Sequence, residues 1–294
     1  MTVAGEHGSL TRRPACGSIV IPAHNEQGTI GFALNALLRE ALEGEFAVVV
    51  ACNGCTDATA DEARKTSAGL PGPIVVLELA EASKPAAIRA AERECAPPRL
   101  YLDADVICST AAAREMLAAV QSVADVAVPT RSFDLSGSTR FARLYYRTWL
   151  ELPWVTNQLA GRGAYALSQL ARSTFGEFPE LVADDRFATT RVPADRAVVT
   201  SERVVVRPPA RLRDVARVRG RVYAGNAALE VDGHDLSIGR RWRGLMRLSM
   251  RPSRWPGLVV FLATTAVAKS RARNAHRAEG IAWTRDVHRR GMSQ

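Results

Sequence analysis

The sequence lacks any apolar run long enough to cross a membrane. Spanning about 30 Å of hydrocarbon takes about 20 consecutive apolar residues, and the most apolar stretch covers only residues 255–268. Residues 1–16 are polar and contain no apolar core, so we expect a flexible N-terminus and no secretory signal peptide. These absences argue against an integral membrane protein and predict a cytoplasmic one.

Cysteine is scarce, and its spacing gives no metal site. The five cysteines, an odd number, are scattered along the chain, which favours free thiols in a reducing compartment. Cys52 and Cys55 have Cys-x-x-Cys spacing, but no second pair stands at zinc spacing. The chain also lacks internal repeats and low-complexity linkers, so its 294 residues should form one α/β domain, alone or with an appendage.

Acidic residues become rare in the last third of the chain. Residues 1–202 hold 19 Lys and Arg against 24 Asp and Glu, a net charge of −5, whereas residues 203–294 hold 20 against 6, a net charge of +14. Such a basic tail indicates an anionic partner, or else a solvated helix surface. Its arginines flank the apolar stretch 255–268, which favours an anionic membrane surface over nucleic acid. The alternative for that stretch is a helix docked on the core.

Continuous Val- and Ile-rich runs of strand length alternate with helical patterns over the first 130 residues. This alternation predicts a mostly parallel sheet covered on both faces by helices. Strands are expected at 17–22, 46–52, 74–79, 99–102 and 125–129, and helices at 28–42, 84–95 and 110–122. Beyond residue 130 we expect helices at 138–152, 209–230 and 236–275, a short strand at 164–167 and an antiparallel strand at 197–206.

Polar motifs stand at the ends of three strands and at the start of a helix. Residues 22–26, 53–57 and 103–105 follow strands, and Asp184-Asp185 begins a helix. Parallel strands deliver their carboxyl ends to one edge of a sheet, so the first three motifs should meet there. Asp103 and Asp105 project to the same side of their strand and suit Mg²⁺ or Mn²⁺ shared with substrate phosphates. The alternative is a strand that simply ends at the surface.

In order and spacing these motifs resemble those of the family 2 glycosyltransferases, from residue 17 to about residue 230. The family pattern is Pro-x-x-Asn-Glu, Asp-Gly-Ser-Thr-Asp, Asp-x-Asp and then Glu-Asp. The resemblance implies a GT-A fold, which is Rossmann-like α/β, here with a basic helical C-terminal extension. It also implies Mn²⁺- or Mg²⁺-dependent, inverting transfer of a sugar from a nucleotide-diphospho-sugar to a hydroxyl acceptor. A lipid-linked or envelope glycan, or a secondary metabolite, would be that acceptor.

The resemblance divides the chain into functional parts. Residues 17–130 would bind the nucleotide-sugar, and residues 131–235 would bind the acceptor and carry the catalytic base. Residues 236–294 would form the extension, expected at the inner face of the cell membrane. Two alternatives are a sugar nucleotidyltransferase, whose Gly-rich first turn this chain lacks, and a non-catalytic membrane-surface protein on a degenerate glycosyltransferase fold.

The resemblance also implies roles for residues around the nucleoside. Glu26 would lie by the ribose, with Pro22 shaping the turn, and Asp57 would cap the next helix and border the nucleotide pocket. Asn53 stands where the family often has an Asp that reads the base. Because an amide both donates and accepts hydrogen bonds, the base preference does not carry over.

Further roles concern the diphosphate and the metal. Lys84 would neutralise diphosphate charge, Asp103 would help to hold the ribose and the metal, and Asp105 would ligate the metal directly. Residues 218–226 keep only an arginine of the Gln-x-x-Arg-Trp motif of processive members, so Arg219 or Arg221 would contact the diphosphate. Arg221 is our predicted donor-binding residue, and the missing Trp argues against polymerisation.

On the acceptor side the resemblance points to two carboxylates and three further residues. Asp184-Asp185 departs from the family's Glu-Asp by one methylene, and Asp185 is the better candidate for the general base. Adjacent carboxylates raise each other's proton affinity, which favours a usable base; the alternative is a helix N-cap. Gly163 would let the backbone approach a sugar, and Trp154 and Tyr165 would stack on it unless they are buried in the core.

Overall fold

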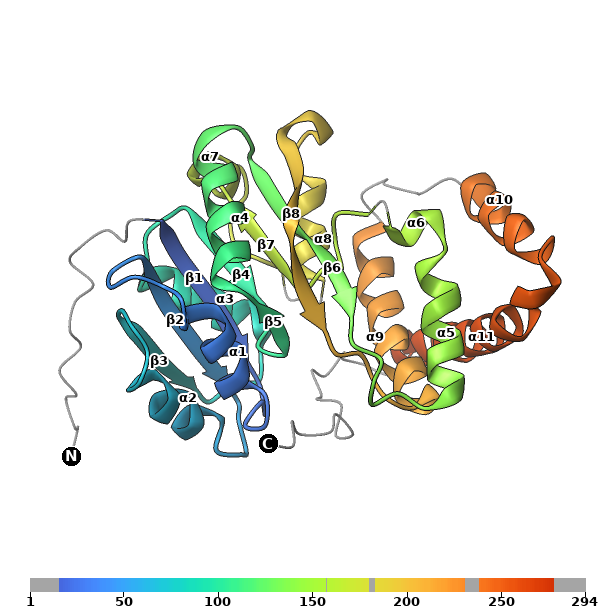
Figure 1. Cartoon of the computed structure of the whole chain (residues 1–294), viewed down its shortest axis with the longest axis horizontal. Helices are drawn as coiled ribbons and strands as arrows, with labels where there is room; N and C mark the ends of the chain where they lie inside the picture. The colour runs from blue at the N-terminus through green and yellow to red at the C-terminus, as the bar shows by residue number, and fades with distance from the viewer. Residues whose placement is uncertain (1–15, 157, 180–182, 231–237, 278–294) are drawn as a thin grey trace.

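The computed structural model describes residues 16–156, 158–179, 183–230 and 238–277 (Figure 1). Most of the expected flexible N-terminus and the last part of the expected extension therefore lie outside the described residues. The described strands are β1 (Gly17–Ala23), β2 (Phe46–Asn53), β3 (Ile74–Leu79), β4 (Arg99–Leu102), β5 (Val106–Cys108), β6 (Val126–Phe133), β7 (Ala164–Leu167) and β8 (Ala197–Val206).

The described helices cover the sheet and continue beyond it. Over the first half of the chain they are α1 (Ile30–Leu38), α2 (Thr59–Ser67), α3 (Lys84–Arg93) and α4 (Thr110–Ser122). The second half contains α5 (Arg140–Leu150), α6 (Pro153–Thr156), α7 (Gln169–Ser173), α8 (Asp184–Thr190), α9 (Leu212–Glu230), α10 (Ile238–Ser249) and α11 (Trp255–Arg277). The expected helices and strands are thus confirmed with shifts of a few residues at their ends, except that the helical stretch 236–275 is divided into α10 and α11 around Pro252.

The described strands form one sheet in the order β3-β2-β1-β4-β7-β6-β8-β5. β3, β2, β1 and β4 run parallel, whereas β7 is antiparallel to both β4 and β6. The prediction of an antiparallel strand at 197–206 is half correct, because β8 pairs parallel with β6 and antiparallel with β5. Alternating apolar and polar residues show that one face is buried, and they carry no information on the direction of the neighbouring strand.

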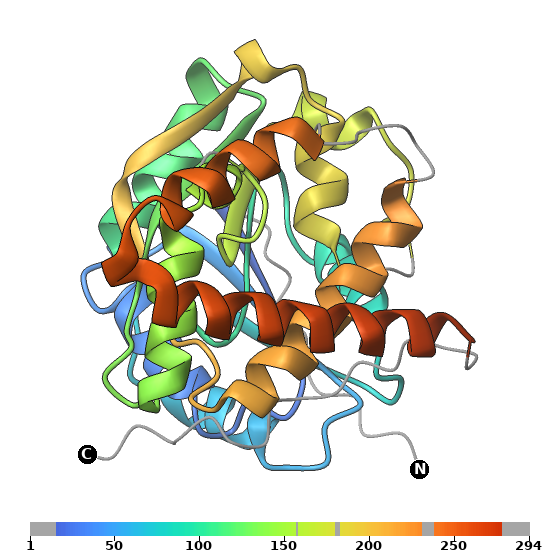
Figure 2. The same ribbon diagram turned by 90° about the vertical axis from the view of Figure 1, so that its right-hand side faces the viewer.

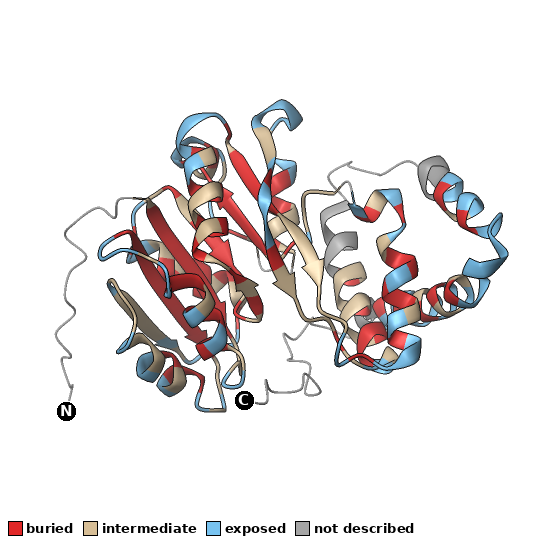
Figure 3. Ribbon diagram, in the orientation of Figure 1, coloured by how far each residue is buried: buried red, intermediate tan, exposed pale blue. Residues whose placement is uncertain are grey.

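Helices pack on both faces of the sheet, as the continuous apolar strands require. Side chains alternate along β1, so Ile19 and Ile21 join the core beneath α1 and α4 while Val20 joins the core beneath α3. In Figure 3 the central strands are buried along almost their whole length. The sheet is therefore a rigid platform, and the loops at the carboxyl ends of β1 and β4 are held in place by it.

A third core joins the C-terminal helices to α5. Tyr145 and Trp149 of α5 pack with Val215 of α9, Leu248 of α10 and Phe261 of α11. Figure 2 shows α11 crossing α5 and α9, and these three helices are in contact. One face of the expected extension is therefore docked on the preceding half of the chain. No helix within the described ranges is both long enough and apolar enough to span a bilayer.

Candidate active site

A cavity of about 310 Å³ opens at the carboxyl ends of β1 and β4, beside β7 and the start of α8. α9 contributes the wall that faces away from the sheet. Eight of the residues expected from the sequence line this cavity: Pro22, Lys84, Asp103, Asp105, Gly163, Tyr165, Asp184 and Asp185. Motifs separated by more than 150 residues in the chain thus meet at one place, as the strand order requires.

Lys84 bridges two carboxylates in this cavity. It opens α3, whose N-cap Ser83 accepts a hydrogen bond from the N–H of Ala86. Its Nζ lies 2.8 Å from Asp103 Oδ1 and 2.7 Å from Asp184 Oδ1. Although burial opposes the charged form, these two carboxylates raise the pKa of Lys84. The side chain therefore remains a cation between the end of β4 and the start of α8.

Asp103 and Asp105 lie in a tight turn between β4 and β5. The N–H of Asp103 donates to Gly163 O at 2.9 Å, and Asp103 O accepts from the N–H of Val106 at 3.1 Å. Within the described part of the chain no group of three His, Cys, Asp or Glu is arranged to hold a metal ion. Two carboxylates fit a hard divalent cation that takes its remaining ligands from substrate phosphates and water.

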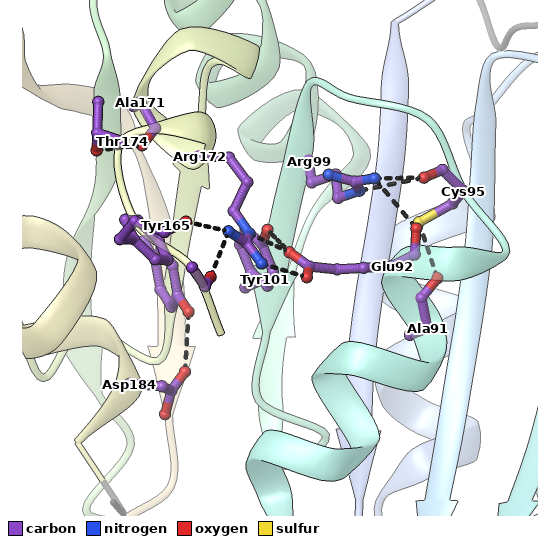
Figure 4. Close-up of polar contacts among 12 residues, drawn as sticks. Ala91, Glu92, Cys95, Arg99, Tyr101, Tyr165, Ala171, Arg172, Thr174 and Asp184 are labelled. Carbon is purple, nitrogen blue, oxygen red and sulfur yellow. Dashed lines mark hydrogen bonds and ion pairs between the residues drawn. The ribbon is translucent and has the colours of Figure 1, made fainter. Parts of the chain in front are cut away.

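Asp184 is buried and fixed on both sides (Figure 4). Besides Lys84 it contacts Tyr165, whose Oη donates to Asp184 Oδ2 at 2.9 Å. Burial and the charge of Asp184 raise the pKa of Tyr165 well above its ordinary value, so this phenol stays protonated and remains a donor. Asp184 therefore has no oxygen left free of a protein partner.

Tyr165 does not offer its ring to a ligand in the way expected from the sequence. Its ring stacks on Tyr101 with a centroid distance of 4.8 Å, and it is 3% exposed. Tyr101 Oη in turn donates to Glu92 Oε1 at 2.5 Å, and Arg172 binds both oxygens of Glu92 at 2.6 and 2.8 Å. Figure 4 shows this chain of contacts from Arg172 to Asp184. Tyr165 thus positions Asp184. Its ring is buried in the core, which is the alternative that the sequence left open to stacking on a sugar.

Asp185 has a different environment from its neighbour. Its Oδ1 accepts from the N–H of Arg186 at 2.7 Å and its Oδ2 accepts from the N–H of Gly161. Burial and the adjacent charge of Asp184 raise the pKa of Asp185 to about 6, against the opposing effect of the Gly161 N–H. A carboxyl with such a pKa can take up and release a proton near neutral pH.

Gly163 is required by the local geometry of the cavity. Its φ is +79°, a left-handed conformation that L side chains rarely adopt, and a Cβ there would lie 2.5 Å from Val106 Cγ2. Because its carbonyl accepts from Asp103, the close packing of Gly163 on Val106 also fixes the turn that carries Asp103 and Asp105.

Glu26, Asn53 and Asp57 do not line the cavity. Asn53 is fully buried and its Nδ2 donates to Ser83 O at 2.8 Å. Glu26 N donates to Thr59 Oγ1 at 2.7 Å, and Asp57 Oδ1 accepts from Thr59 N at 3.1 Å at the start of α2. The expectation that Asp57 caps the helix is not met, because the N-cap of α2 is Ala58 and no side chain caps it. These residues tie the loops after β1 and β2 together.

Two further expectations differ from the structure. Trp154 lies against α10, since a Cβ on Gly244 would come within 2.6 Å of Trp154 Cζ3, and it does not line the cavity. Arg219, and not Arg221, lines the cavity. Residues two positions apart on a helix point in directions about 200° apart, so only one of these two arginines can face it.

Several lining residues were not assigned a role from the sequence, among them Trp149 of α5. The guanidinium of Arg219 on α9 lies 4.9 Å from the centre of the Trp149 ring. The aromatic run of α5 is the signal that could have pointed to Trp149. Its partner on α9 depends on how the two helices pack, which the sequence pattern does not specify.

The fold and motifs described above match known proteins. A family model described as glycosyl transferase family 2 matches residues 18–166. The mannosyltransferase PcManGT from Pyrobaculum calidifontis, solved with GDP-Man and Mn²⁺, has a TM-score of 0.57 and 18% identity, covering 92% of this chain and 77% of that one. No curated protein matches the chain.

A second solved structure has a similar fold. Glucosyl-3-phosphoglycerate synthase from Mycobacterium tuberculosis, solved with Mn²⁺, UDP-glucose and phosphoglyceric acid, has a TM-score of 0.52 and 17% identity. The match covers 73% of this chain and 78% of that one. At these identities the two likenesses establish the fold alone.

Proposed function

Because the chain belongs to glycosyltransferase family 2, we propose that it transfers a sugar with inversion from a nucleotide-diphospho-sugar to a hydroxyl acceptor, using Mn²⁺ or Mg²⁺. The observation that carries this proposal is the single cavity that joins Asp103 and Asp105 to Asp185. A pair of carboxylates suited to a metal and a carboxyl suited to proton transfer are the two parts that such a reaction needs.

The donor side of the cavity contains Lys84, Asp103 and Asp105. Asp103 and Asp105 would hold the divalent cation, which when bound would neutralise charge on the departing diphosphate. Lys84 adds a fixed positive charge beside them. The solved structures of similar fold contain Mn²⁺ with GDP-Man or UDP-glucose, which supports a sugar nucleotide donor and a divalent cation here.

The acceptor side contains the base, which we assign to Asp185. As the acceptor oxygen attacks the anomeric carbon, Asp185 takes its proton, and the bond from that carbon to the diphosphate oxygen breaks with its electron pair. A base with a pKa of about 6 is ionised at neutral pH and still accepts a proton readily. Asp184 is the poorer candidate, because the Lys84 cation stabilises its charged form, whereas the oxygens of Asp185 accept from neutral backbone N–H groups.

The donor site is tested by thermal shift with UDP, GDP and their sugar conjugates, each with Mn²⁺ and with EDTA. A ligand that binds the folded state raises the melting temperature by mass action. We expect a metal-dependent rise with one nucleotide and its loss in Asp105→Asn, while Asp61→Asn, at an exposed position on α2, retains it. If Asp105→Asn kept the full metal-dependent rise in melting temperature, the assignment of the metal site would be contradicted.

We also propose that the surface of α10 and α11 rests on the inner face of the membrane, where a lipid-linked acceptor would be presented. Large apolar side chains are exposed there, including Trp242 at 63% and Met250 at 81%. Exposed arginines close to them in the chain are Arg243, Arg247, Arg251 and Arg254. Exposed Trp and Met next to Arg are typical of helices that lie in an anionic membrane interface.

Sedimentation with phosphatidylglycerol vesicles tests this surface. We expect the full chain to bind these vesicles and to bind phosphatidylcholine vesicles weakly, because both apolar burial and charge contribute. The double variant Trp242→Ala/Met250→Ala should lose binding, whereas Leu42→Ala, at an exposed apolar position elsewhere, should not. Equal binding of the vesicles by both variants would contradict the membrane proposal and would leave the assignment of the donor site unchanged.

A further inference from the structure

Three polar groups between α5 and α9 are incompletely satisfied. Trp149 Nε1 and Arg219 Nε are buried and make no hydrogen bond to any described residue, and the buried Tyr145 Oη has the Arg219 guanidinium as its polar neighbour. Buried polar groups are almost always hydrogen-bonded, so each exception calls for an explanation. Arg219 lies 4.9 Å from the centre of the Trp149 ring, and its charge acts on the Tyr145 phenol, so the three exceptions belong to one cluster. Their clustering suggests groups prepared for a ligand.

Arg219 carries a positive charge with no carboxylate partner among the described residues. Its contacts there are with the faces of Trp149 and Tyr223, the latter at 5.2 Å. Stacking between two rings holds the planar guanidinium in place. The Tyr223 hydroxyl takes part of its hydrogen-bonding capacity, and its Nε–H has no partner among the described residues. This arrangement suits a fixed anion-binding residue better than a surface arginine, which would be solvated.

The surroundings of Arg219 are rich in positive charge. Arg131 lies 5.3 Å from the centre of the same Trp149 ring, and Arg162 lies nearby. Burial and the charges of Arg162 and Arg219 lower the pKa of Arg131 to about 10, with Asp185 acting in the opposite direction. Arg131 and Arg162 are satisfied by backbone carbonyls, among them Val155 O and Pro129 O. Arg219 Nε makes no such bond within the described ranges, so Arg219 is the cation of this group with an N–H left for a ligand.

The cluster lies on the side of the cavity that holds Asp185. Trp149 and Arg219 line the same cavity as Asp185. Arg131, stacked on Trp149, donates to Gly161 O, and the N–H of Gly161 donates to Asp185. The metal-side carboxylate Asp103 instead has Lys84 as its cation. A ligand group on Arg219 would thus be close to the attacking hydroxyl.

Resting on the function proposed above, we propose that Arg219 and Trp149 bind an anionic oxygen group of the acceptor, a phosphate or a carboxylate. The guanidinium would give a charge-assisted hydrogen bond, and the indole N–H would add a second donor. The acceptor is accordingly an anionic alcohol, with its charged group near the hydroxyl that receives the sugar.

Calorimetric titration of the full chain with inorganic phosphate, and separately with acetate, tests the subsite and tells phosphate from carboxylate. Each titration is made on the protein alone and on protein loaded with Mn²⁺ and UDP or GDP. We expect one of the anions to bind, with an affinity that the bound nucleotide changes less than about twofold. Arg219→Gln should weaken that anion about tenfold or more, since a hydrogen bond to a charged group is lost.

A conservative variant keeps the test independent of folding. Trp149→Phe removes one donor and keeps an aromatic ring, and it should weaken the anion several-fold while nucleotide affinity is retained. Arg140→Gln, at an exposed position on α5, is the matched control and should bind the anion as the unaltered chain does.

Three outcomes would overturn the inference. Competition between the anion and the nucleotide would assign Arg219 to the donor diphosphate, as would loss of nucleotide affinity in Arg219→Gln with anion affinity retained. Absence of anion binding to nucleotide-loaded protein would remove the subsite and leave the proposed function standing. By contrast, anion binding through Arg219 in a protein that binds no nucleotide would support the anion site and contradict the proposed function.

Discussion

The ammonium group of Lys84 lies 2.7 Å from Asp184 Oδ1 and so connects the start of α3 to the start of α8, 100 positions later in the chain. Asp184 is buried and Lys84 is partly buried, with 15% of its side chain exposed, and Asp184 has Tyr165 as its second partner. The same Nζ also contacts Asp103, which is more exposed. One cation therefore holds the donor-side carboxylate and the acceptor-side helix at a fixed separation.

Lys84→Met is expected to destabilise the protein by about 3 kcal/mol, because it leaves the buried charge of Asp184 without its cation. Urea unfolding of the two proteins measures the difference. Lys65→Met, at an exposed position on α2, is the control and should change stability by less than about 0.5 kcal/mol. Equal stability of Lys84→Met and the unaltered chain would mean that Asp184 is protonated, or that solvent reaches it.

The transfer rate should rise with pH through about 6 if Asp185 is the base. Its pKa is raised to about 6, so the ionised form that accepts the proton is depleted below that pH. The pH dependence of kcat/KM measures this. Asp185→Asn should lower kcat by about 100-fold or more while nucleotide affinity is retained. A rate that is flat between pH 5 and pH 8, values spanning the pKa of about 6, would assign the base elsewhere.

The raised pKa of Asp185 also predicts how the stability of the folded protein depends on pH. A carboxyl whose folded-state pKa is raised binds its proton more tightly in the folded than in the unfolded chain. Its contribution is fully present below the ordinary value of 3.8 and is lost as the pH rises through about 6. The stability of Asp185→Asn relative to the unaltered chain should therefore increase between those two pH values, as measured by urea unfolding.

Much of the fold can be predicted from the sequence because the buried strands are continuous runs of apolar residues. β1 and β2 are buried along their whole length, and such runs read as strands of a parallel sheet without any knowledge of their neighbours. Asp103, Asp105 and Lys84 could be placed at one edge for the same reason, since the end of a strand or the start of a helix fixes each of them.

Other features depend on tertiary packing and carry no local signal. β5 has three residues, too few for a recognisable pattern, and the direction of β8 depends on which strands flank it. The choice between Arg219 and Arg221 depends on the rotation of α9 against α5. Trp154 has an aromatic ring of the kind that stacks on sugars. Because Gly244 has no side chain, however, α10 can pack directly over that ring.

The Tyr165→Phe variant separates the role of the Tyr165 hydroxyl in positioning Asp184 from the role of its ring in packing on Tyr101. It removes the O–H that donates to Asp184 and keeps the ring stacked on Tyr101, so we expect a loss of about 1–2 kcal/mol in stability and a several-fold fall in kcat. Tyr101→Phe is the matched variant, because its O–H donates to Glu92, which retains both bonds from Arg172. It should leave kcat unchanged. Equal falls in kcat in the two variants would mean that losing either hydroxyl has the same effect, so that the bond to Asp184 does not specifically set the position of α8.

Gly163→Ala should damage both stability and the donor site. The left-handed backbone at φ +79° disfavours any side chain, and the new Cβ would meet Val106 Cγ2 at 2.5 Å, a buried group on a β-branched side chain with little room to turn. Together these effects should cost about 2 kcal/mol or more in urea unfolding. Because Gly163 O accepts from Asp103 N, the displaced backbone should also weaken metal-dependent nucleotide binding.

Two further variants separate the cost of the clash with Val106 from the cost of the backbone strain at residue 163. Gly163→Ala/Val106→Ala removes the clash but leaves the backbone strain, so it should recover nucleotide binding more fully than stability, since the truncated Val106 itself leaves a small cavity. Gly137→Ala has no atom within 4 Å of its new Cβ and should behave as the unaltered chain in both measurements. If Gly163→Ala binds nucleotide normally despite its lower stability, the turn that carries Asp103 is held by its own hydrogen bond to Val106, and β7 contributes only to folding.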